Sequence, residues 1–491
     1  MDSEKMDEKA PVVVNETPYV ADDVYPLHTL DHNPNYVDWV MRYNDVLDAD
    51  MLKKSLSRLL EIGDWRKLGG RFRYKPDGML EIFVPGSSAG PRENVSFTHN
   101  VIDSTIGDHP IASKLPARTV GPSLHLVSPE SRPFNGRENF PVFKEMTEKD
   151  IPPISVHVTS FLDATIIALS WPHQLMDAMG GKALLAGWSS VLAGREDEVP
   201  EVIGAREDIL QHPDIQKQDE EEFILEKDRL SGASLLLFQL RFIWDHLWNG
   251  KREKRVIYLP KESFLKMKDQ IKAELAENAS DVENPPWVTE NDIISAWAAR
   301  CLALSESSSR PITVLNFLNL RFRIPLLAKS TGVFLQNICV GTFTFLSSKL
   351  ARAPVSEIAV ANRQHTAEQG TDIQGRRLMN GMMKDIQEGR EPRILFGPSS
   401  AVCMVVNNVI KIELMKTAQF GPAVIRQGES SETRRNPPGT MISYYNEYLD
   451  HMYDAFNAFV MFGKDYGDDF WLGGALLPKA WKVFEQELKK M

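Results

Sequence analysis

A histidine and an aspartate four residues apart form the pair of side chains best suited to chemistry in this sequence. They lie in the run Trp171-Pro172-His173-Gln174-Leu175-Met176-Asp177. An imidazole titrates near neutral pH and can accept a proton from a reacting group, so His173 is a candidate general base. The carboxylate of Asp177 either pairs with His173 or turns away toward a cationic partner. The spacing alone does not choose between these two arrangements.

The elements around this pair predict that His173 lies in a loop between a strand and a helix. Ala164 to Ser170 is a nearly continuous apolar run rich in branched side chains, which is typical of a strand covered on both faces. Lys182 to Leu192 carries a one-sided apolar stripe that predicts a helix. The Gly180-Gly181 pair before it relaxes the backbone. A rigid strand end of this kind can aim His173 into a cleft.

Further segments match a family pattern in the correct chain order. They are Tyr25-Pro26-Leu27 with Leu30-Asp31, Leu56 to Pro85, Thr289 to Trp297, Asn319-Leu320-Arg321-Phe322-Arg323, and Asn337. Together with the motif of His173 and Asp177, they make the chain similar to the BAHD superfamily of acyl-CoA-dependent acyltransferases. The resemblance covers nearly the whole length and is strongest to the fungal secondary-metabolism branch.

The resemblance implies an α/β fold and a reaction. The expected fold has two chloramphenicol-acetyltransferase-like domains, each a mixed β-sheet flanked by helices, with the active site in the channel between them. The expected reaction moves an acyl group, most simply acetyl, from acyl-CoA to a hydroxyl of a lipophilic secondary metabolite. In this family the motif aspartate pairs with the arginine of a nearby strand. The resemblance therefore implies a structural clamp between Asp177 and Arg321, acyl-CoA as co-substrate, and no bound cofactor.

One segment departs from the family pattern. Where the family has Asp-Phe-Gly-Trp-Gly, this chain has Gln419-Phe420-Gly421-Pro422-Ala423, so only Phe420 and Gly421 remain of a motif expected near the donor channel. This departure leaves two alternatives open. The fold could serve a cyclase or a binding protein in natural-product biosynthesis, or the acyl donor could be a carrier-protein thioester.

Acyl transfer also needs donors for the oxyanion and the exclusion of water. Asn407 and Asn408 follow the apolar run 401–406 and are candidate oxyanion or acyl-site residues, with a turn-forming role as the alternative. The sequence has no Gly-x-Ser-x-Gly elbow, and its three cysteines lie in apolar contexts with no cluster of basic residues that would activate a thiol. We therefore expect direct transfer in a ternary complex. His173 lacks a second ligand at metal-binding spacing, so no metal is expected.

Length and net charge limit the number of domains and the kinds of partner that the chain can have. At 491 residues it exceeds the size of one hydrophobic core, so two domains are expected. We predict an N-terminal domain over 1–195, an exposed, charged crossover linker over 196–222, and a C-terminal domain over 223–491. A net charge of −11 disfavours nucleic acid as a partner. The expected partners are acyl-CoA and a small acceptor, and the expected state is a monomer.

Two segments bear on location. Met1 to Glu16 is acidic and lacks the basic start and apolar core of a signal peptide, which predicts a cytoplasmic protein. Leu235 to Trp248 is apolar but is interrupted by polar residues, and it is shorter than the roughly 20 residues of a membrane span. We expect this helix to pack in the core or between the domains. Binding to a membrane surface is the alternative, because the basic segment Lys251 to Arg255 follows it.

Overall fold

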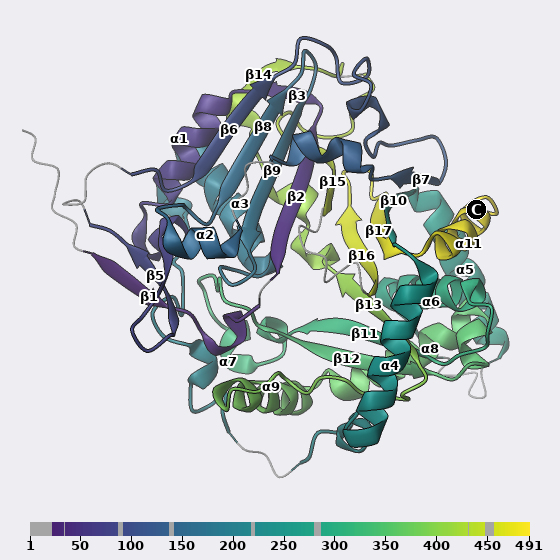
Figure 1. Cartoon of the computed structure of the whole chain (residues 1–491). Helices are drawn as coiled ribbons and strands as arrows, with labels where there is room; N and C mark the ends of the chain where they lie inside the picture. Colours follow the sequence, from purple (N-terminus) through teal and green to yellow (C-terminus); the bar gives the residue numbers. More distant parts are fainter. Residues whose placement is uncertain are drawn as a thin grey trace, which may run out of the picture.

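Two mixed sheets organise the protein (Figure 1). The structure is a computed structural model that describes residues 22–33, 35–86, 92–136, 142–217, 221–278, 286–430, 432–446 and 456–491. The segment Met1 to Glu16, used above to predict location, lies outside these residues. The five-stranded sheet has the order β15 (Met441–Asn446), β2 (Tyr36–Tyr43), β9 (Thr165–Pro172), β8 (Ser155–Ser160), β6 (Ser96–Val101).

The second sheet has seven strands and contains parallel neighbours. Its order is β12 (Cys339–Leu346), β11 (Ile312–Asn319), β13 (Val402–Asn408), β16 (Asn457–Lys464), β17 (Phe470–Leu476), β10 (Glu253–Leu259), β7 (Ser123–Leu126). Strand β13 is parallel to both β11 and β16, whereas the other pairs in this sheet are antiparallel. The predicted α/β class, with mixed sheets flanked by helices, is confirmed.

Helices cover both sheets. On the five-stranded sheet, α1 (Ala49–Leu59) packs against α3 (Ala178–Leu192). Against the seven-stranded sheet lie α6 (Glu290–Ser305), α8 (Val355–Gln369) and α11 (Pro478–Leu488). Helix α6 begins with the capping box expected from its sequence, in which Thr289 and Asp292 bond each other's backbone N–H groups at 3.3 and 2.8 Å.

The chain passes between the two sheets more than once. Strand β7 precedes β8 in the sequence but pairs with β10 of the other sheet. Strand β15 comes late in the sequence but pairs with β2, and β14 (Val424–Gln427) pairs with β3 (Asp45–Leu47). The predicted boundaries at 195 and 222 stay a prediction. The five-stranded sheet nevertheless contains β15 from the predicted C-terminal domain, and the seven-stranded sheet contains β7 from the predicted N-terminal domain.

The charged segment after residue 195 is less exposed than its composition predicts. Val202, Leu210 and Ile215 are buried, and Val202 forms a bridge to Val333. Further along the segment, the carbonyl of Gly204 lies 2.6 Å from Nε2 of His28. The expectation of a wholly exposed linker was wrong because single apolar residues, too sparse to show periodicity, are inserted between the charged ones as anchors.

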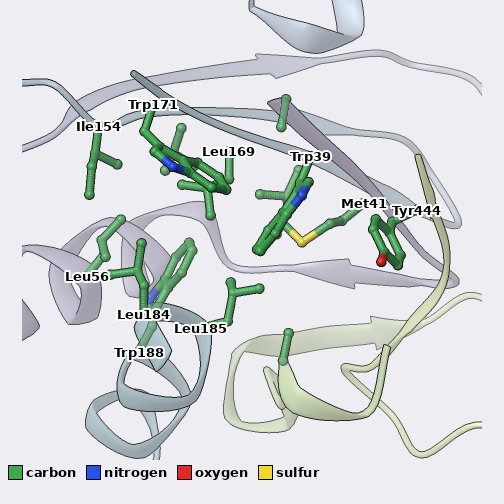
Figure 2. Close-up of a cluster of buried hydrophobic side chains, with 14 of the residues drawn as sticks. Trp39, Met41, Leu56, Ile154, Leu169, Trp171, Leu184, Leu185, Trp188 and Tyr444 are labelled. Atoms are coloured by element: carbon green, nitrogen blue, oxygen red, sulfur yellow. The ribbon is translucent and has the colours of Figure 1, made fainter. Parts of the chain in front are cut away.

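Tryptophans dominate the core beneath β2 and β9 (Figure 2). Trp39 of β2 and Trp171 of β9 meet edge to face, with ring centroids 4.8 Å apart. Helix α3 approaches them so closely that a Cβ on Gly181 would lie 2.5 Å from the Trp39 ring. The helix begins at Ala178, four residues earlier than predicted. The glycine pair therefore lies inside the helix and permits close packing, rather than loosening the backbone before it.

Helix α4 (Gly232–Asn249) corrects a second expectation. Phe238 is its one buried residue, and seven of its large apolar side chains are exposed. The helix therefore lies on the surface and not in the core or between the domains. No helix within the described ranges has the length and apolar character needed to cross a membrane.

Candidate active site

His173 lies immediately after β9, in the loop that leads to α3. Its backbone is held from both sides. The N–H of His173 donates to the carbonyl of Asn35 at 2.7 Å, and Nδ2 of Asn337 donates to the carbonyl of His173 at 3.0 Å. The loop thus has a defined position, as expected for a strand-end histidine.

Asn337 is itself fixed by a buried carboxylate. Oδ1 of Asp31, which is fully buried, accepts from both the backbone N–H and Nδ2 of Asn337, each at 2.8 Å. Asp31 and Asn337 were noticed in the sequence only as points of resemblance and had no predicted role. No local pattern reveals this role, because the two residues are 306 positions apart.

The imidazole of His173 is kept neutral by its surroundings. Burial lowers the pKa of His173, and the nearby Asp177 carboxylate opposes that shift. The Nδ1 atom is buried and has no hydrogen-bond partner among the described residues. A neutral imidazole is the form that can accept a proton.

Asp177 turns away from His173. Its Oδ1 caps α3, accepting from the N–H groups of Met179 at 3.0 Å and Gly180 at 3.1 Å. The same carboxylate meets Arg321 in a two-pronged ion pair, with Nη1 to Oδ2 at 2.7 Å and Nη2 to Oδ1 at 3.1 Å. Of the two arrangements open from the sequence, the geometry corresponds to the second.

The side chain of Arg321 is held in place by hydrogen bonds to nearby backbone carbonyls. Arg321 lies two residues beyond β11, in a 3-10 turn over Leu320–Phe322, and not on the strand as expected. Its Nη2 also donates to the carbonyls of Phe334 at 3.2 Å and Gln336 at 2.6 Å. The side chains of Arg321 and Asp177 are only 7% and 5% exposed. This is a buried pair whose charges are matched and hydrogen-bonded.

A cavity connects this region to solvent. His173 lines a small cavity of about 50 Å³, and Asp177 lines an adjoining cavity of about 670 Å³. The two share Ala178, Phe317, Asn407 and Val409 in their walls. The larger cavity opens at the carboxyl ends of β11 and β13, where α/β sheets commonly bind ligands.

The structure separates the two candidate asparagines. Asn407 lines both cavities and so lies near His173. Asn408 lines the larger cavity but not the small one; its Nδ2 donates to Asn291 at 2.7 Å and its Oδ1 accepts from the N–H of Ile410 at 3.0 Å. Asn408 thus makes the turn that follows β13, whereas Asn407 has the position of a candidate oxyanion donor.

The remnant of the C-terminal motif lies in the core. Phe420 is fully buried between Tyr43, at a ring distance of 5.7 Å, and Trp188, at 4.7 Å. The N–H of Phe420 donates to the carbonyl of Gly439 at 2.8 Å. Neither Phe420 nor Gly421 is among the described residues that line the two cavities. Their contacts are those of packing residues.

Two partly buried thiols, that of Cys339 at the site and that of Cys403 at the amino end of β13, are unreactive. Cys339 lines the larger cavity, and burial raises the pKa of its thiol to about 12. Burial likewise raises the pKa of the Cys403 thiol to about 12. Both stay protonated at neutral pH and are poor nucleophiles. Across the described ranges, no group of three or more His, Cys, Asp or Glu residues could hold a metal ion.

Comparison with known proteins agrees with this geometry. Residues 128–405, more than half of the chain, match the Transferase family. The chain belongs to this family, that of the BAHD acyltransferases. The O-acetyltransferase PaAT-2 of Phomopsis amygdali is 30% identical over 97% of this chain and 100% of that protein. The acetyltransferase BOT5 of Botryotinia fuckeliana is 32% identical over 96% of this chain and 92% of its own length.

Solved structures show the same fold. TRI101 of F. sporotrichioides, in complex with coenzyme A and T-2, superimposes with a TM-score of 0.64. The two proteins share 13% sequence identity, and the match covers 95% of this chain and 98% of that one. This BAHD acyltransferase is therefore an enzyme of the acyl-CoA-dependent O-acyltransferase class, related to fungal acetyltransferases.

Proposed function

We propose that this enzyme transfers an acetyl group from acetyl-CoA to a hydroxyl of a lipophilic secondary metabolite, with His173 as general base. The observation that carries the proposal is the position of His173. Its imidazole, half-buried and with a lowered pKa, lines a small cavity that adjoins the solvent-open cavity of about 670 Å³. Such a volume accommodates a small-molecule ligand.

The proposed reaction needs no enzyme nucleophile. The acceptor hydroxyl attacks the thioester carbonyl while its proton moves to the imidazole of His173. The side-chain amide of Asn407 stabilises the resulting oxyanion. Collapse of the tetrahedral intermediate breaks the C–S bond, and the CoA thiolate takes the proton from the imidazolium. The Asp177 carboxylate favours this transient cation electrostatically, because it acts against the effect of burial on the pKa of His173.

Basic residues in the larger cavity support CoA as donor. Arg323, Arg363 and Lys411 line it, beside the carboxylates Asp177, Glu290 and Asp292. Two of these carboxylates are paired with other cations, Asp177 with Arg321 and Glu290 with Lys464. Arg323, Arg363 and Lys411 can bind the phosphates of CoA. TRI101 of F. sporotrichioides was crystallised with coenzyme A, which adds support.

Other residues that line the larger cavity are consistent with a lipophilic acceptor. Phe317, Phe322, Val406 and Val409 line part of the larger cavity, whose remaining lining includes many polar and charged side chains. The apolar side chains can contact the apolar body of a lipophilic acceptor, and the polar side chains can bind its hydroxyls. TRI101 of F. sporotrichioides was crystallised with T-2 as well as coenzyme A, which adds support for a second small-molecule ligand beside the donor.

Two-substrate kinetics test this order of events. We expect intersecting double-reciprocal lines when acetyl-CoA and the acceptor are varied together, because both must be bound before the acyl group moves. Parallel lines, or an acylated protein isolated without acceptor, would establish a covalent intermediate and contradict the proposal. If an acyl carrier protein protects the enzyme against thermal unfolding and acyl-CoAs do not, the assignment of acetyl-CoA as the donor is wrong.

A further inference from the structure

Helix α4 carries an apolar face that the fold leaves uncovered. The exposed fractions of its side chains run from 47% to 77% at Leu236, Leu237, Leu240, Ile243, Trp244, Leu247 and Trp248. Their spacing places them on one side of the helix. Figure 1 shows α4 as a long helix on the near side of the molecule. We call this set of seven residues the α4 apolar face.

The opposite side of α4 is fastened to the protein. Phe242 packs on Phe456 with a ring distance of 4.9 Å, and Asp245 forms an ion pair with Arg310 at 2.7 Å. Nζ of Lys479 donates to Oδ1 of Asn249 at 3.0 Å. The helix is therefore held in place by one side, and its apolar face points outward in a fixed orientation.

We propose that the α4 apolar face docks this enzyme on the surface of an anionic lipid bilayer. The helix lies in the membrane interface with its apolar side chains among the lipids, and it does not span the bilayer. The proposal goes beyond the acyl-transfer reaction and does not depend on it.

The most exposed end of the helix has the chemistry of a membrane interface. Trp244 and Trp248 stack with ring centroids 5.6 Å apart, and Trp248 is 77% exposed. Tryptophan is favoured where lipid head groups meet the acyl chains. The exposed Lys251 lies two residues after the helix, where an ammonium group can reach lipid phosphates.

The local charge also matches an anionic surface. The one carboxylate of α4, Asp245, is neutralised by Arg310. The segment after the helix, Lys251-Arg252-Glu253-Lys254-Arg255, carries four basic residues and one acidic residue. Glu253 is paired with Arg255 at 2.7 Å. A basic excess beside an apolar face, in a chain with a net charge of −11, favours attraction to anionic lipids.

A second copy of the chain fits this face less well. A helix of this length measures about 27 Å, and with a side-chain width of about 10 Å it offers roughly 270 Å² for contact. A standard protein interface buries about 800 Å² on each partner. The apolar face of one helix is too small for a stable dimer, whereas it is ample for an interfacial anchor.

Docking on lipid leaves the active site open. Helix α4 contacts residues at the amino ends of the parallel strands, namely Arg310 before β11, Ser399 before β13 and Phe456 before β16. The cavity opens at the carboxyl ends of β11 and β13. If the acceptor is lipophilic, as proposed above, docking would also bring the enzyme to the phase in which its substrate concentrates.

Vesicle flotation with the full chain tests the proposal. We expect the protein to float with vesicles made of phosphatidylcholine and phosphatidylserine in equal parts, and less with phosphatidylcholine alone. The double substitution Ile243→Gln and Leu247→Gln should reduce binding by about tenfold or more, since two exposed apolar side chains that would insert into the lipid are lost. The matched control, Met79→Gln with Ile425→Gln, removes apolar side chains of comparable exposure elsewhere and should bind like the original protein.

Three outcomes would overturn the proposal. They are failure of the original protein to float with either vesicle, equal loss of binding in the control, and a dimer in light scattering that the α4 variant converts to a monomer. The last would identify a second copy as the occupant of the face. Quenching of tryptophan fluorescence by brominated lipids in the unchanged protein provides a second measurement that requires no variant. Vesicle binding needs no substrate, so its failure is distinct from failure of the proposed reaction.

Discussion

Burial of the imidazole decides the protonation state of His173 more than the neighbouring carboxylate does. The pKa of His173 lies below its ordinary value because the charged form loses hydration on burial. The base is therefore already in its proton-accepting form at neutral pH. Asp177, with both oxygens bonded to Arg321 and α3, affects it only through its field.

The pH profile of kcat/KM should reflect this lowered pKa. We expect a plateau around neutral pH and a fall in rate as the pH drops through an apparent pKa below about 6.5, where the imidazole becomes protonated. His173→Ala should reduce turnover by about 10²- to 10⁴-fold and abolish this acidic limb. An acidic limb that persists in the folded variant would assign the base to another residue.

The pH experiment needs a folding control because the same group affects stability. Below about 6.5 the unfolded chain binds more protons at His173 than the folded chain does, so stability is lost as the pH falls. Circular dichroism at each pH separates unfolding from loss of the base. The profile is interpreted only where the protein remains folded.

The ion pair between Asp177 and Arg321 should show strong coupling. Asp177→Ala and Arg321→Ala should each destabilise the fold by about 3 to 5 kcal/mol, since each leaves the other charge buried and unpaired. The double variant should lose less than the sum of the two, as measured by denaturant unfolding. Asp177→Asn, which keeps an oxygen to cap α3, separates the loss of charge from the loss of the cap. Simple additivity would show that the two residues are not coupled.

At the scale of elements, the contact between α3 and β2 depends on a residue without a side chain. A Cβ at position 181 would lie 2.5 Å from the rigid ring of Trp39. Gly181→Ala should therefore destabilise the protein by about 1 to 3 kcal/mol through overpacking, measured as a lower denaturant midpoint.

Gly381 in α9 (Asp372–Gln387) is the matched control for that substitution. A Cβ there would meet no atom within 4 Å. Gly381→Ala should stabilise the protein by roughly 0.5 to 1 kcal/mol, because alanine has the better helix propensity. A neutral result at position 181 would show that α3 can move away from Trp39.

At the scale of the whole molecule, the exchange of strands makes the two halves depend on each other. Without residues 223–491 the five-stranded sheet lacks β15, and without residues 1–222 the seven-stranded sheet lacks β7. We expect that neither 1–222 nor 223–491 alone shows a cooperative thermal transition, and that co-expression restores one. A cooperative transition of a single half would show that the exchanged strands are dispensable.

The sequence by itself determined the local framework of the site. The buried strand before His173, the helix after it and the capped start of α6 all follow from side chains within a few positions of one another. Short-range rules suffice there, because hydrogen bonding and apolar periodicity act along the chain. The position of His173 at a strand end was predictable for the same reason.

Only the tertiary structure decided which distant groups meet and which face stays uncovered. Asp177 and Arg321 are 144 positions apart, and Asp31 and Asn337 are 306 apart. The apolar stripe of α4 is the same pattern whether it is buried or exposed, so the expectation of core packing was wrong. Periodicity shows that a helix has an apolar face. What covers that face depends on how the two sheets and their helices fill space, which no short segment encodes.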